Sequence, residues 1–403
     1  MLLSARDAAR RLGIKPATLY AYVSRGLLRS APGGEGRTRR YYAEDVARLE
    51  RLRRAGRRGG APPKPFDPLL PVLDTSLSLI ENGRLYYRGV DAGALAATAE
   101  LETVAELMWG EGAAPFAVAH LKPALRQLLA RPRLPAAAID RARVILVGLA
   151  MEDVGALEVA PQAVARTGTR LVPALVAAVT GVMPTGRAAH AELATAWRLG
   201  QAGADLVRRC LVLGADHELN ASTYVGRCIA STGASPYAVV LGALGALSGP
   251  RHGGGTAEVE SLLREVLRTG DLEGRIAARL RRGERIPGFG HPLYPDGDPR
   301  ARDILEAVAA SRYGGESTAA LRVGRDIAAL IGRRPNIDFA LGLAAVVLRL
   351  PAGSALGMFL IARSVGWIAH AIEQYATGAL IRPRARYVGV LPARADGAAR
   401  DWA

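Results

Sequence analysis

The chain has 403 residues, of which 50% are hydrophobic, 22% are charged and only 5% are aromatic. This length suits two or three folding units, and the abundance of helix-forming residues favours a mainly α-helical protein. Two cysteines, Cys210 and Cys228, exclude a disulfide framework and a cysteine metal site, so we expect a cytoplasmic protein. No apolar run looks long enough to cross a membrane, and the charged start MLLSARDAARR lacks a signal-peptide core.

The net charge of +16 is unevenly distributed along the chain. Residues 1–64 contain 16 of the 53 Lys and Arg but only 5 of the 37 Asp and Glu. Such an excess at one end is typical of a small nucleic-acid-binding unit. Nearly all of the basic residues are arginines, however, so part of the excess reflects a codon bias as well as function.

The first 56 residues predict two short helices, a hairpin and a third helix. Ala8, Ala9 and Leu12 give the first helix an apolar face. Pro16 suits the first turn of the second helix, and Gly26 ends it. The segment RSAPGGEGRTRRYY then predicts a hairpin, or wing, and AEDVARLERLRRAG predicts the third helix.

This order of elements resembles the helix-turn-helix of the MerR and excisionase-like families, in AARRLGIKPATLYAYVSRGLL and RRYYAEDVARL. The resemblance implies that the second helix enters the major groove of DNA while the wing contacts phosphates. The residues it implies for DNA binding are Lys15, Thr18, Tyr20, Arg25, Arg37, Arg39 and Arg40. The alternative is a solvated basic module that serves protein contacts. Residues 57–66 follow as a Gly/Pro linker, where MerR relatives usually have a long dimerisation helix.

Residues 67–403 show helix after helix, with apolar residues spaced by three and four and closed by Gly or Pro. We expect one hairpin in this part, in SLSLIENGRLYYRGVD, with its turn at Asn82-Gly83. The sequence shows neither a repeat of fixed period nor a Gly-rich phosphate loop.

Three of the six histidines lie in polar or glycine-rich segments. His217 stands in ADHELNAST, His252 in GALSGPRHGGG and His291 in IPGFGHPLYPDGDPRA. Flanking glycines let a side chain approach a ligand closely, although a hydrogen-bonded histidine in a turn is an equally good interpretation for any one of them. No histidine pair with a carboxylate has the spacing of a metal site. A structural role is favoured for those in helical sequence, His120, His190 and His370.

Asp338 precedes an apolar helix in RPNIDFALG, and well-separated arginines accompany it in the sequence. Arg300 in DPRA, Arg363 in IARSVGW and Arg382 in IRPRARYVG suit a small polyanionic substrate, because guanidinium forks bind carboxylates bidentately. Surface ion pairs are the alternative for any single arginine in a chain so rich in them.

Taken in order, these segments strongly resemble citrate synthase. The resemblance covers roughly residues 67–392 and includes ADHELNAST, GALSGPRHGGG, IPGFGHPLYPDGDPRA, NIDF, ARSVGWIAHAIEQ and IRPRARYVG. It implies an all-α fold with a large domain and a small mobile domain at about 254–345, assembled at least as a dimer. It also implies that oxaloacetate and acetyl-CoA are the substrates and that no cofactor is tightly bound.

The resemblance assigns roles to the residues that match the family's motifs. Asp338 would be the base that removes a proton from the acetyl group, His252 would hydrogen-bond the thioester oxygen, and His291 would polarise the keto group of oxaloacetate. A glycine-rich loop would contact CoA through Gly288, Phe289 and Gly290. Oxaloacetate would be held by His217, Arg300, Arg363 and, from a partner subunit, Arg382. The other polar residues of ADHELNAST would cap a helix and orient the histidine.

The chain departs from the family's pattern at several positions. GFGHPLYPDG lacks the basic residue that usually follows the histidine, Arg251 replaces a usual leucine, and Ala340 and Leu341 stand where tyrosine and serine are more typical. Since one methylene changes binding by only about 1–3 kcal/mol, a 2-methylcitrate synthase that uses propionyl-CoA is an alternative. A second alternative is a DNA-binding transcriptional regulator that uses a synthase-like domain as a sensor.

Overall fold

The computed structural model describes residues 2–12, 14, 19, 22–23, 28–32, 39–47, 73–110, 116, 122–311, 315–383, 385 and 389. The chain divides into two compact units, Met1–Leu73 and Asp74–Ala403. The predicted linker, residues 57–66, lies outside the described residues, so its boundaries stay a prediction.

The first unit has a small core of its own. As predicted, Ala8, Ala9 and Leu12 form the buried face of its first helix, and they pack against Leu28 and Tyr41. The two strands of the wing pair as predicted, and the first residues of the chain add a third strand that the sequence analysis did not predict. The sheet has the antiparallel order β1-β3-β2, and the elements are β1 (Leu2–Ser4), α1 (Ala5–Leu12), β2 (Ser30–Pro32) and β3 (Arg39–Tyr42).

Of the residues predicted to bind DNA, only two are described. Arg39 and Arg40 lie exposed on β3, and Arg39 Nη1 donates a hydrogen bond to Ser30 Oγ at 3.1 Å. Lying outside the described residues are Lys15, Thr18, Tyr20, Arg25 and Arg37. The role of all seven in DNA binding stays a prediction.

The second unit opens with the predicted hairpin, formed by β4 (Ser78–Glu81) and β5 (Arg84–Tyr87). Asn82 and Gly83 have φ angles of 50° and 73°, and positive values at both central positions are those of a type I′ turn. The chain turns a second time at Arg88-Gly89 into β6 (Val90–Asp91), which the sequence analysis did not predict.

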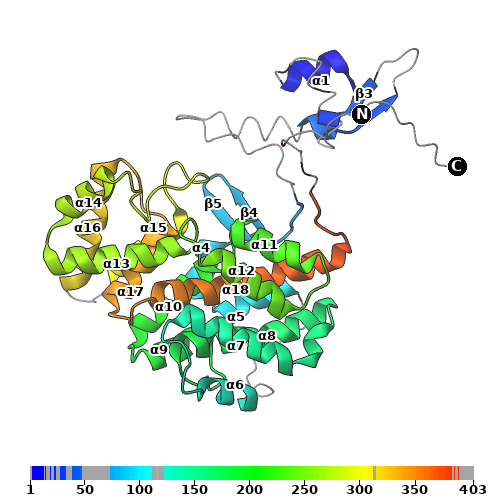
Figure 1. Cartoon of the computed structure of the whole chain (residues 1–403). Coiled ribbons are helices and arrows are strands. Elements are labelled where there is room, and N and C mark those ends of the chain that lie inside the picture. The colour runs from blue at the N-terminus through cyan, green and yellow to red at the C-terminus, as the bar shows by residue number, and fades with distance from the viewer. Residues whose placement is uncertain are drawn as a thin grey trace. The chain divides into compact units, whose positions relative to one another are not determined.

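The rest of this unit is helical, which confirms the predicted fold class (Figure 1). Its helices are α4 (Ala92–Thr98), α5 (Leu101–Trp109), α6 (Lys122–Leu129), α7 (Ala138–Glu152), the 3₁₀ helix η2 (Val154–Leu157), α8 (Pro161–Thr180), α9 (Ala189–Ala196), α10 (Gln201–Gly214), α11 (Ala221–Ala230), α12 (Pro236–Leu247), α13 (Gly254–Thr269), α14 (Leu272–Arg281), α15 (Pro299–Ala310), α16 (Gly315–Ile331), α17 (Ile337–Val347) and α18 (Ser354–Thr377).

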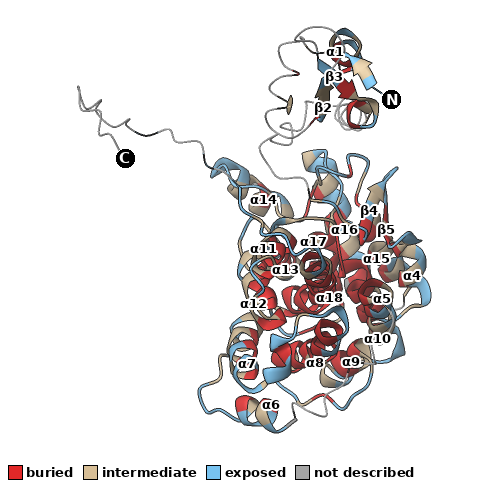
Figure 2. Ribbon diagram, turned by 90° about the vertical axis from the view of Figure 1, so that its right-hand side faces the viewer, coloured by how far each residue is buried: buried red, intermediate tan, exposed pale blue. Residues whose placement is uncertain are grey.

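Helix α18 is the centre of the core. It packs against α5, α8, α10, α11 and α12, and Figure 2 shows buried residues concentrated along it and its neighbours. By length and composition it is the one helix of the described residues that could cross a membrane, so the expectation that no run is long enough was wrong. The helix is instead buried inside the protein, and Arg363 and His370 interrupt its apolar sequence.

Helices α13 to α17 gather on one side of α18 (Figure 1). They span Gly254–Val347, which is close to the predicted small domain at 254–345. Most candidate functional residues lie in loops and helix ends where this group meets the helices around α18, and Arg363 lies within α18 itself.

Candidate active site

His217 lies in the loop between α10 and α11, with only 6% of its surface exposed. Its Nε2 is 3.0 Å from the Tyr294 hydroxyl, and its ring meets that of His291 edge-on with centroids 5.0 Å apart. Burial, followed by the charge of Arg300, lowers the pKa of His217 well below its usual value. The imidazole is therefore neutral at pH 7 and interacts through hydrogen bonds.

The neighbouring Asp216 is fully buried and ties this loop to the hairpin and to α18. Its Oδ2 accepts a hydrogen bond from the Ser78 hydroxyl at 2.6 Å and lies 3.3 Å from His370 Nε2. Burial opposes its ionisation, but His370 and Arg363 outweigh burial and hold the pKa of Asp216 below its usual value. The loop that carries His217 therefore also contains a buried negative charge, on the adjacent Asp216.

His252 lies between α12 and α13 in a run of glycines that approach neighbouring backbone. A Cβ at Gly254 would lie 2.7 Å from the carbonyl oxygen of Gly249, so only glycine fits there. The Nε2 of His252 is 2.8 Å from the hydroxyl of Ser222 in α11. Burial and then the charge of Arg363 lower the pKa of His252 to about 4, so this ring is neutral as well.

The Ser222 hydroxyl has one proton to donate and three polar neighbours. It accepts a hydrogen bond from Trp367 Nε1 at 3.2 Å, donates one to Asn220 Oδ1 at 2.8 Å, and lies 2.8 Å from His252 Nε2. Asn220 Oδ1 also accepts from the backbone N–H of Thr223, which fixes the orientation of the amide. When Ser222 donates to His252, that ring carries its proton on Nδ1, so the hydroxyl decides which nitrogen can donate to a ligand.

His291 follows a glycine-rich loop that packs on the start of α17. Gly288 has a φ of +83°, and a Cβ there would lie 2.9 Å from the Cβ of Phe339. The Nδ1 of His291 accepts a hydrogen bond from the backbone N–H of Leu293 at 3.2 Å, which leaves the ring proton on Nε2. Burial and then Arg300 lower the pKa of His291 to about 4, so Nε2–H is the donor of a neutral ring.

The three residues predicted to contact CoA hold this loop in place. The buried ring of Phe289 packs on Phe339 with centroids 4.9 Å apart. Gly290 donates its N–H to the Arg334 carbonyl oxygen at 2.8 Å, and Gly288 accepts the N–H of Asn336 at 2.9 Å. These contacts account for the loop structurally, and contact with CoA stays a prediction.

Asp338 lies in the first turn of α17, where the side chain of Asn336 caps the helix by accepting the backbone N–H groups of Asp338 and Phe339. The Thr256 hydroxyl donates a hydrogen bond to Asp338 Oδ1 at 2.6 Å. Burial raises the pKa of Asp338 to about 6, despite that hydrogen bond and the charge of Arg300. The carboxyl group therefore changes its protonation state near neutral pH, as a general base requires.

Two buried guanidinium groups accompany these side chains. Arg300 binds Asp298 bidentately, with Nε–Oδ1 at 2.9 Å and Nη2–Oδ2 at 2.7 Å, and Asp298 also accepts the N–H of Ile337. Arg363 Nε donates to the Gly214 carbonyl oxygen at 2.8 Å, while its Nη2 is buried and has no partner in the described part of the chain. Since an unpartnered buried donor is costly, this nitrogen is a candidate ligand contact.

The candidate groups share one electrostatic environment. Besides burial, the charges of Arg300, His291, Arg363 and His252 lower the pKa of His217. The same two guanidinium groups partly oppose the rise that burial causes in the pKa of Asp338. The predicted residues that the fold brings together are thus His217, His252, His291, Arg300, Asp338 and Arg363. Arg382 lies apart from them, exposed beyond the end of α18. The roles of all seven stay predictions.

Sequence reasoning missed three side chains that hold this region together. Thr256 binds Asp338, Tyr294 binds His217, and Asp298 binds Arg300. For Asp298 the sequence does carry a signal, because an aspartate before a proline that opens a helix is a typical N-cap, and it caps α15. The partners of the other two come from distant segments, which no local pattern reveals.

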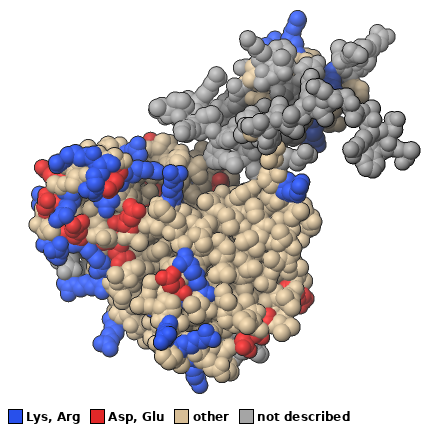
Figure 3. Space-filling model, viewed as in Figure 1, with Lys and Arg blue, Asp and Glu red and all other residues tan. Residues whose placement is uncertain are grey.

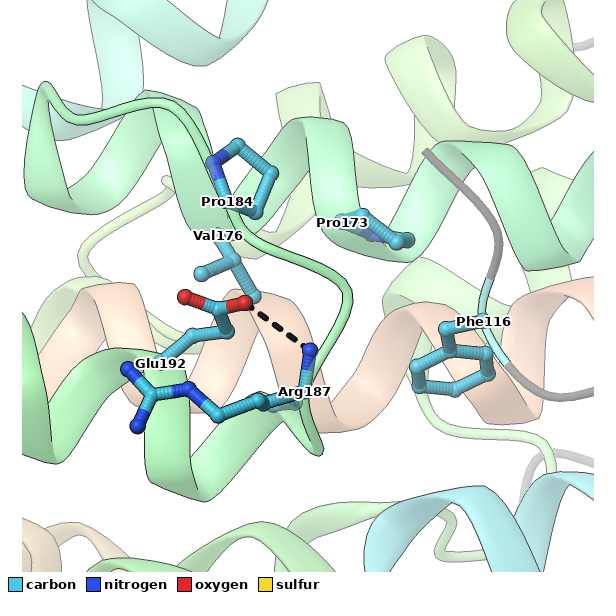
Figure 4. Close-up of a pocket in the computed structure, with 7 residues that line it drawn as sticks. Phe116, Pro173, Val176, Pro184, Arg187 and Glu192 are labelled. Atoms are coloured by element: carbon cyan, nitrogen blue, oxygen red, sulfur yellow. Dashed lines mark hydrogen bonds between the residues drawn. The ribbon is translucent and has the colours of Figure 1, made fainter. Parts of the chain in front are cut away.

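A small hollow in the large helical part is not a candidate site. It has a volume of about 10 Å³, room for about one water molecule, and is lined by Pro173, Val176 and Glu192 among others. Figure 4 shows Glu192 directed at the backbone N–H of Arg187, and its Oε1 also accepts the N–H groups of Thr185 and Gly186. The Glu192 carboxylate therefore stabilises the turn at residues 185–187 by accepting its backbone N–H groups.

Residues 69–384 match the family described as Citrate synthase, C-terminal domain, and residues 2–53 match a Helix-turn-helix domain family. A protein of Mycobacterium tuberculosis (strain ATCC 25618 / H37Rv), provisionally named citrate synthase 2, is 44% identical over 193 residues, which cover 45% of this chain and 50% of that protein. The 2-methylcitrate synthase 1 of Corynebacterium glutamicum is 37% identical over 186 residues, covering 45% and 49%. The chain thus spans about half the length of these curated relatives.

The crystal structure of citrate synthase from Thermotoga maritima MSB8 resembles this chain with a TM-score of 0.67 and 25% sequence identity. The similarity covers 81% of this chain and 95% of that one. It confirms the predicted citrate-synthase-like helical fold, and the helix-turn-helix match confirms the predicted nature of the first unit.

Proposed function

Because the chain belongs to the citrate synthase family, we propose that it condenses acetyl-CoA with oxaloacetate and water to give citrate and CoA. The observation that carries the proposal is the buried carboxyl group of Asp338, whose pKa is raised to about 6 in the vicinity of two neutral imidazoles, His252 and His291. Every acid–base and hydrogen-bonding group that the reaction needs is then a side chain of the protein.

Removal of a proton from the acetyl methyl group is the difficult step, since a thioester α-proton is a very weak acid. Asp338 accepts this proton, and its raised pKa makes it a stronger base than an exposed aspartate. His252 donates a hydrogen bond from Nδ1 to the thioester oxygen and stabilises the developing enolate. For this the Ser222 proton turns from Asn220 Oδ1 to His252 Nε2, both of which lie 2.8 Å from the hydroxyl oxygen.

The nucleophilic carbon then attacks the keto carbon of oxaloacetate. His291 donates a hydrogen bond from Nε2 to the keto oxygen, which draws electron density from the carbon, and it supplies the proton that the new alkoxide takes. Water finally cleaves the thioester and releases CoA. Arg300 and Arg363, together with His217, hold the two carboxylates of oxaloacetate in this arrangement.

We propose that the protein acts as a homodimer. Figure 3 shows few charged side chains over the right-hand half of the second unit, where Figure 1 places α8, α11 and α12. A broad face that is poor in charge suits burial against a second copy. Arg382 would then complete the site of the partner, since it is exposed and apart from the cluster in its own chain.

Release of free thiol from acetyl-CoA in the presence of oxaloacetate tests the condensation. We expect turnover by the intact protein and a loss of about 10²–10⁴-fold in Asp338→Ala, because a positioned base typically contributes that much. Binding of oxaloacetate should be largely unchanged in this variant. Turnover at the level of the unmodified protein would remove Asp338 from the role of base.

The same assay with propionyl-CoA tests the 2-methylcitrate alternative. The observation that favours it is the similarity to the 2-methylcitrate synthase of Corynebacterium glutamicum. Equal concentrations of the two thioesters, run side by side, give the ratio of kcat/KM values. A ratio in favour of propionyl-CoA would make 2-methylcitrate the product.

We also propose that the first unit binds DNA. The helix-turn-helix match over residues 2–53, the basic excess in residues 1–64 and the exposed Arg39 and Arg40 on the wing support this second function. Replacing both arginines by alanine should weaken binding of duplex DNA and reduce its salt dependence, as expected for lost phosphate contacts. The control is Arg84→Ala, in the other unit. If this variant binds duplex DNA as tightly as the unmodified protein does, the weakening comes from the loss of Arg39 and Arg40.

A further inference from the structure

Three glycines follow His252, and packing requires the first two of them. A Cβ at Gly253 would lie 2.8 Å from the Leu247 carbonyl oxygen, and one at Gly254 would lie 2.7 Å from the Gly249 carbonyl oxygen. These backbone oxygens cannot move aside without moving the chain. A residue without a side chain is therefore needed at both positions.

Packing gives no such reason for the third glycine, Gly255. Outside its own helix and its chain neighbours, a Cβ there would meet one atom within 4 Å, Oδ2 of Asp338, at the ordinary van der Waals distance of 3.7 Å. Its φ is not positive, so the backbone does not require glycine either. Gly255 lies in the first turn of α13, where glycine is a poorer helix former than alanine. The glycine thus costs helix stability and leaves open the space beside the Asp338 carboxylate.

The oxygen of Asp338 that faces Gly255 is the one free to accept a proton. Thr256 donates a hydrogen bond to the other oxygen, Oδ1, at 2.6 Å. Among the residues that the structure describes, none donates a hydrogen bond to Oδ2. A carbon that loses its proton to Oδ2 has to come within about 3–3.5 Å of it. That carbon then lies next to the open position at Gly255.

His252 belongs to the same turn of the chain as Gly255. The N–H of Gly255 donates a hydrogen bond to the His252 carbonyl oxygen at 3.0 Å. In the proposed condensation, His252 binds the thioester oxygen and Asp338 takes the proton from the adjacent carbon, the α-carbon of the acyl group. The acyl group therefore lies between these two side chains and beside Gly255.

The width of this space is fixed by the crossing of α13 and α17. A Cβ at Gly342 would lie 2.6 Å from Val259 Cγ1 and 3.1 Å from the backbone nitrogen of Glu260. Val259 is four residues after Gly255 and so on the same face of α13. Gly342 stands in the same relation to Asp338 on α17. Because the helices already touch at Val259 and Gly342, they cannot move together to close the space at Gly255.

We propose that Gly255 determines which acyl group the site accepts, an inference that rests on the proposed condensation. The hydrogen atom in place of a side chain leaves room for a methyl group on the α-carbon, so the site takes a propionyl as well as an acetyl group. A Cβ at this position would occupy the same space. The α-carbon of a propionyl group carries two protons, of which Asp338 removes one, and the carbon then attacks the keto carbon of oxaloacetate as before.

Thiol release from acetyl-CoA and from propionyl-CoA, with oxaloacetate present, tests the proposal in Gly255→Ala. We expect the unmodified protein to use both thioesters. In the variant, the kcat/KM ratio of propionyl-CoA to acetyl-CoA should fall about 10- to 200-fold, which is the effect of one methylene group in a confined pocket. Turnover of acetyl-CoA should change little. The thermal midpoint should be equal or higher, since alanine replaces glycine in a helix.

Gly245→Ala is the matched control, because it adds the same carbon to a helical glycine where a Cβ meets nothing within 4 Å. Its kcat/KM ratio should equal that of the unmodified protein. An unchanged ratio in Gly255→Ala, or an equal fall in the control, would overturn the proposal. So would an equal loss with both thioesters in Gly255→Ala, or an unmodified protein that uses acetyl-CoA alone.

Binding separates this proposal from the condensation itself. Asp338→Asn, which lacks the base, is saturated with oxaloacetate and titrated with each thioester in a calorimeter, with and without Gly255→Ala. We expect the added methyl group to weaken binding of propionyl-CoA about tenfold or more and that of acetyl-CoA little. If this contrast is found but the unmodified protein releases no thiol, the condensation is refuted and the role of Gly255 stands. A protein that shows neither thiol release nor this contrast overturns both.

Discussion

At the scale of single residues, Asp338 combines a functional and a destabilising effect. Its pKa is raised from 3.8 to about 6 by burial, so the folded protein binds this proton more tightly than the unfolded chain does. Stability therefore falls as pH rises from about 4 through 6, and the full cost of the buried charge, at most about 3 kcal/mol, is present above pH 6.

The variant Asp338→Asn removes this charge and keeps an acceptor for Thr256. We expect it to be inactive and yet more stable than the unmodified protein at pH 8, by roughly 2 kcal/mol, with a smaller difference at pH 5. Urea unfolding at both pH values measures this. If Asp338→Asn is no more stable than the unmodified protein at pH 8, the ionised carboxylate of Asp338 does not destabilise the folded protein.

Ser222 influences the proposed reaction through its hydroxyl proton, which affects which ring nitrogen of His252 carries a proton. Among the residues that the structure describes, Ser222 is the hydrogen-bond partner of His252 Nε2, and its proton, when turned from Asn220 to that nitrogen, keeps the ring proton on Nδ1 for the thioester oxygen. We expect Ser222→Ala to lower kcat about 10²-fold, at the low end of the range for loss of a positioned donor, with little change in the KM for oxaloacetate. The control is Ser231→Ala at the end of the same helix. Loss of oxaloacetate binding in Ser222→Ala would instead indicate a general disturbance of the site.

At the scale of elements, α18 positions the loop that carries His217, because the residue of α18 that faces this loop is a glycine, Gly366. A Cβ at Gly366 would lie 2.5 Å from the Ala215 carbonyl oxygen and 2.5 Å from Asp216 Oδ1. The absence of this carbon lets the loop that carries His217 lie directly on α18. The backbone oxygen cannot move aside without moving the loop.

We therefore expect Gly366→Ala to destabilise the protein by about 1–3 kcal/mol and to weaken oxaloacetate binding. Gly245→Ala is the control, since a Cβ there meets nothing within 4 Å. In the interior of α12 it should stabilise the protein by up to about 1 kcal/mol. Thermal melts and oxaloacetate titrations of the two variants measure the contrast, and similar behaviour of both would contradict the close packing at Gly366.

The sequence predicts elements better than it predicts contacts between them. Periodicity and turn residues indicated the helices and the hairpin at Asn82-Gly83, and glycine-rich context singled out His252 and His291. Local patterns could not reveal that Thr256 binds Asp338, because 82 residues separate them. They also misjudged α18, because the buried Arg363 and His370 interrupt the apolar sequence of this core helix.

At the scale of the whole molecule, one predicted residue remains outside the cluster in its own chain. Arg382 lies exposed five residues beyond the end of α18, whereas the other two arginines predicted to bind oxaloacetate, Arg300 and Arg363, are buried. If it binds oxaloacetate, a second copy has to bring it to the site. Activity would then depend on association of two chains, and each site would contain residues of both.

Co-expression of two inactive variants distinguishes this arrangement from one within a single chain. Asp338→Asn lacks the base, and Arg382→Ala lacks the arginine for its partner. In a mixed dimer, the site built on the Arg382→Ala chain has its own Asp338 and receives Arg382 from the other chain, so one site of two is complete. Equal co-expression gives half mixed dimers, and we expect about a quarter of the unmodified activity. If Arg382 instead serves its own chain, both sites of the mixed dimer are defective and no thiol is released, whereas full activity of Arg382→Ala alone would exclude the residue from the site altogether.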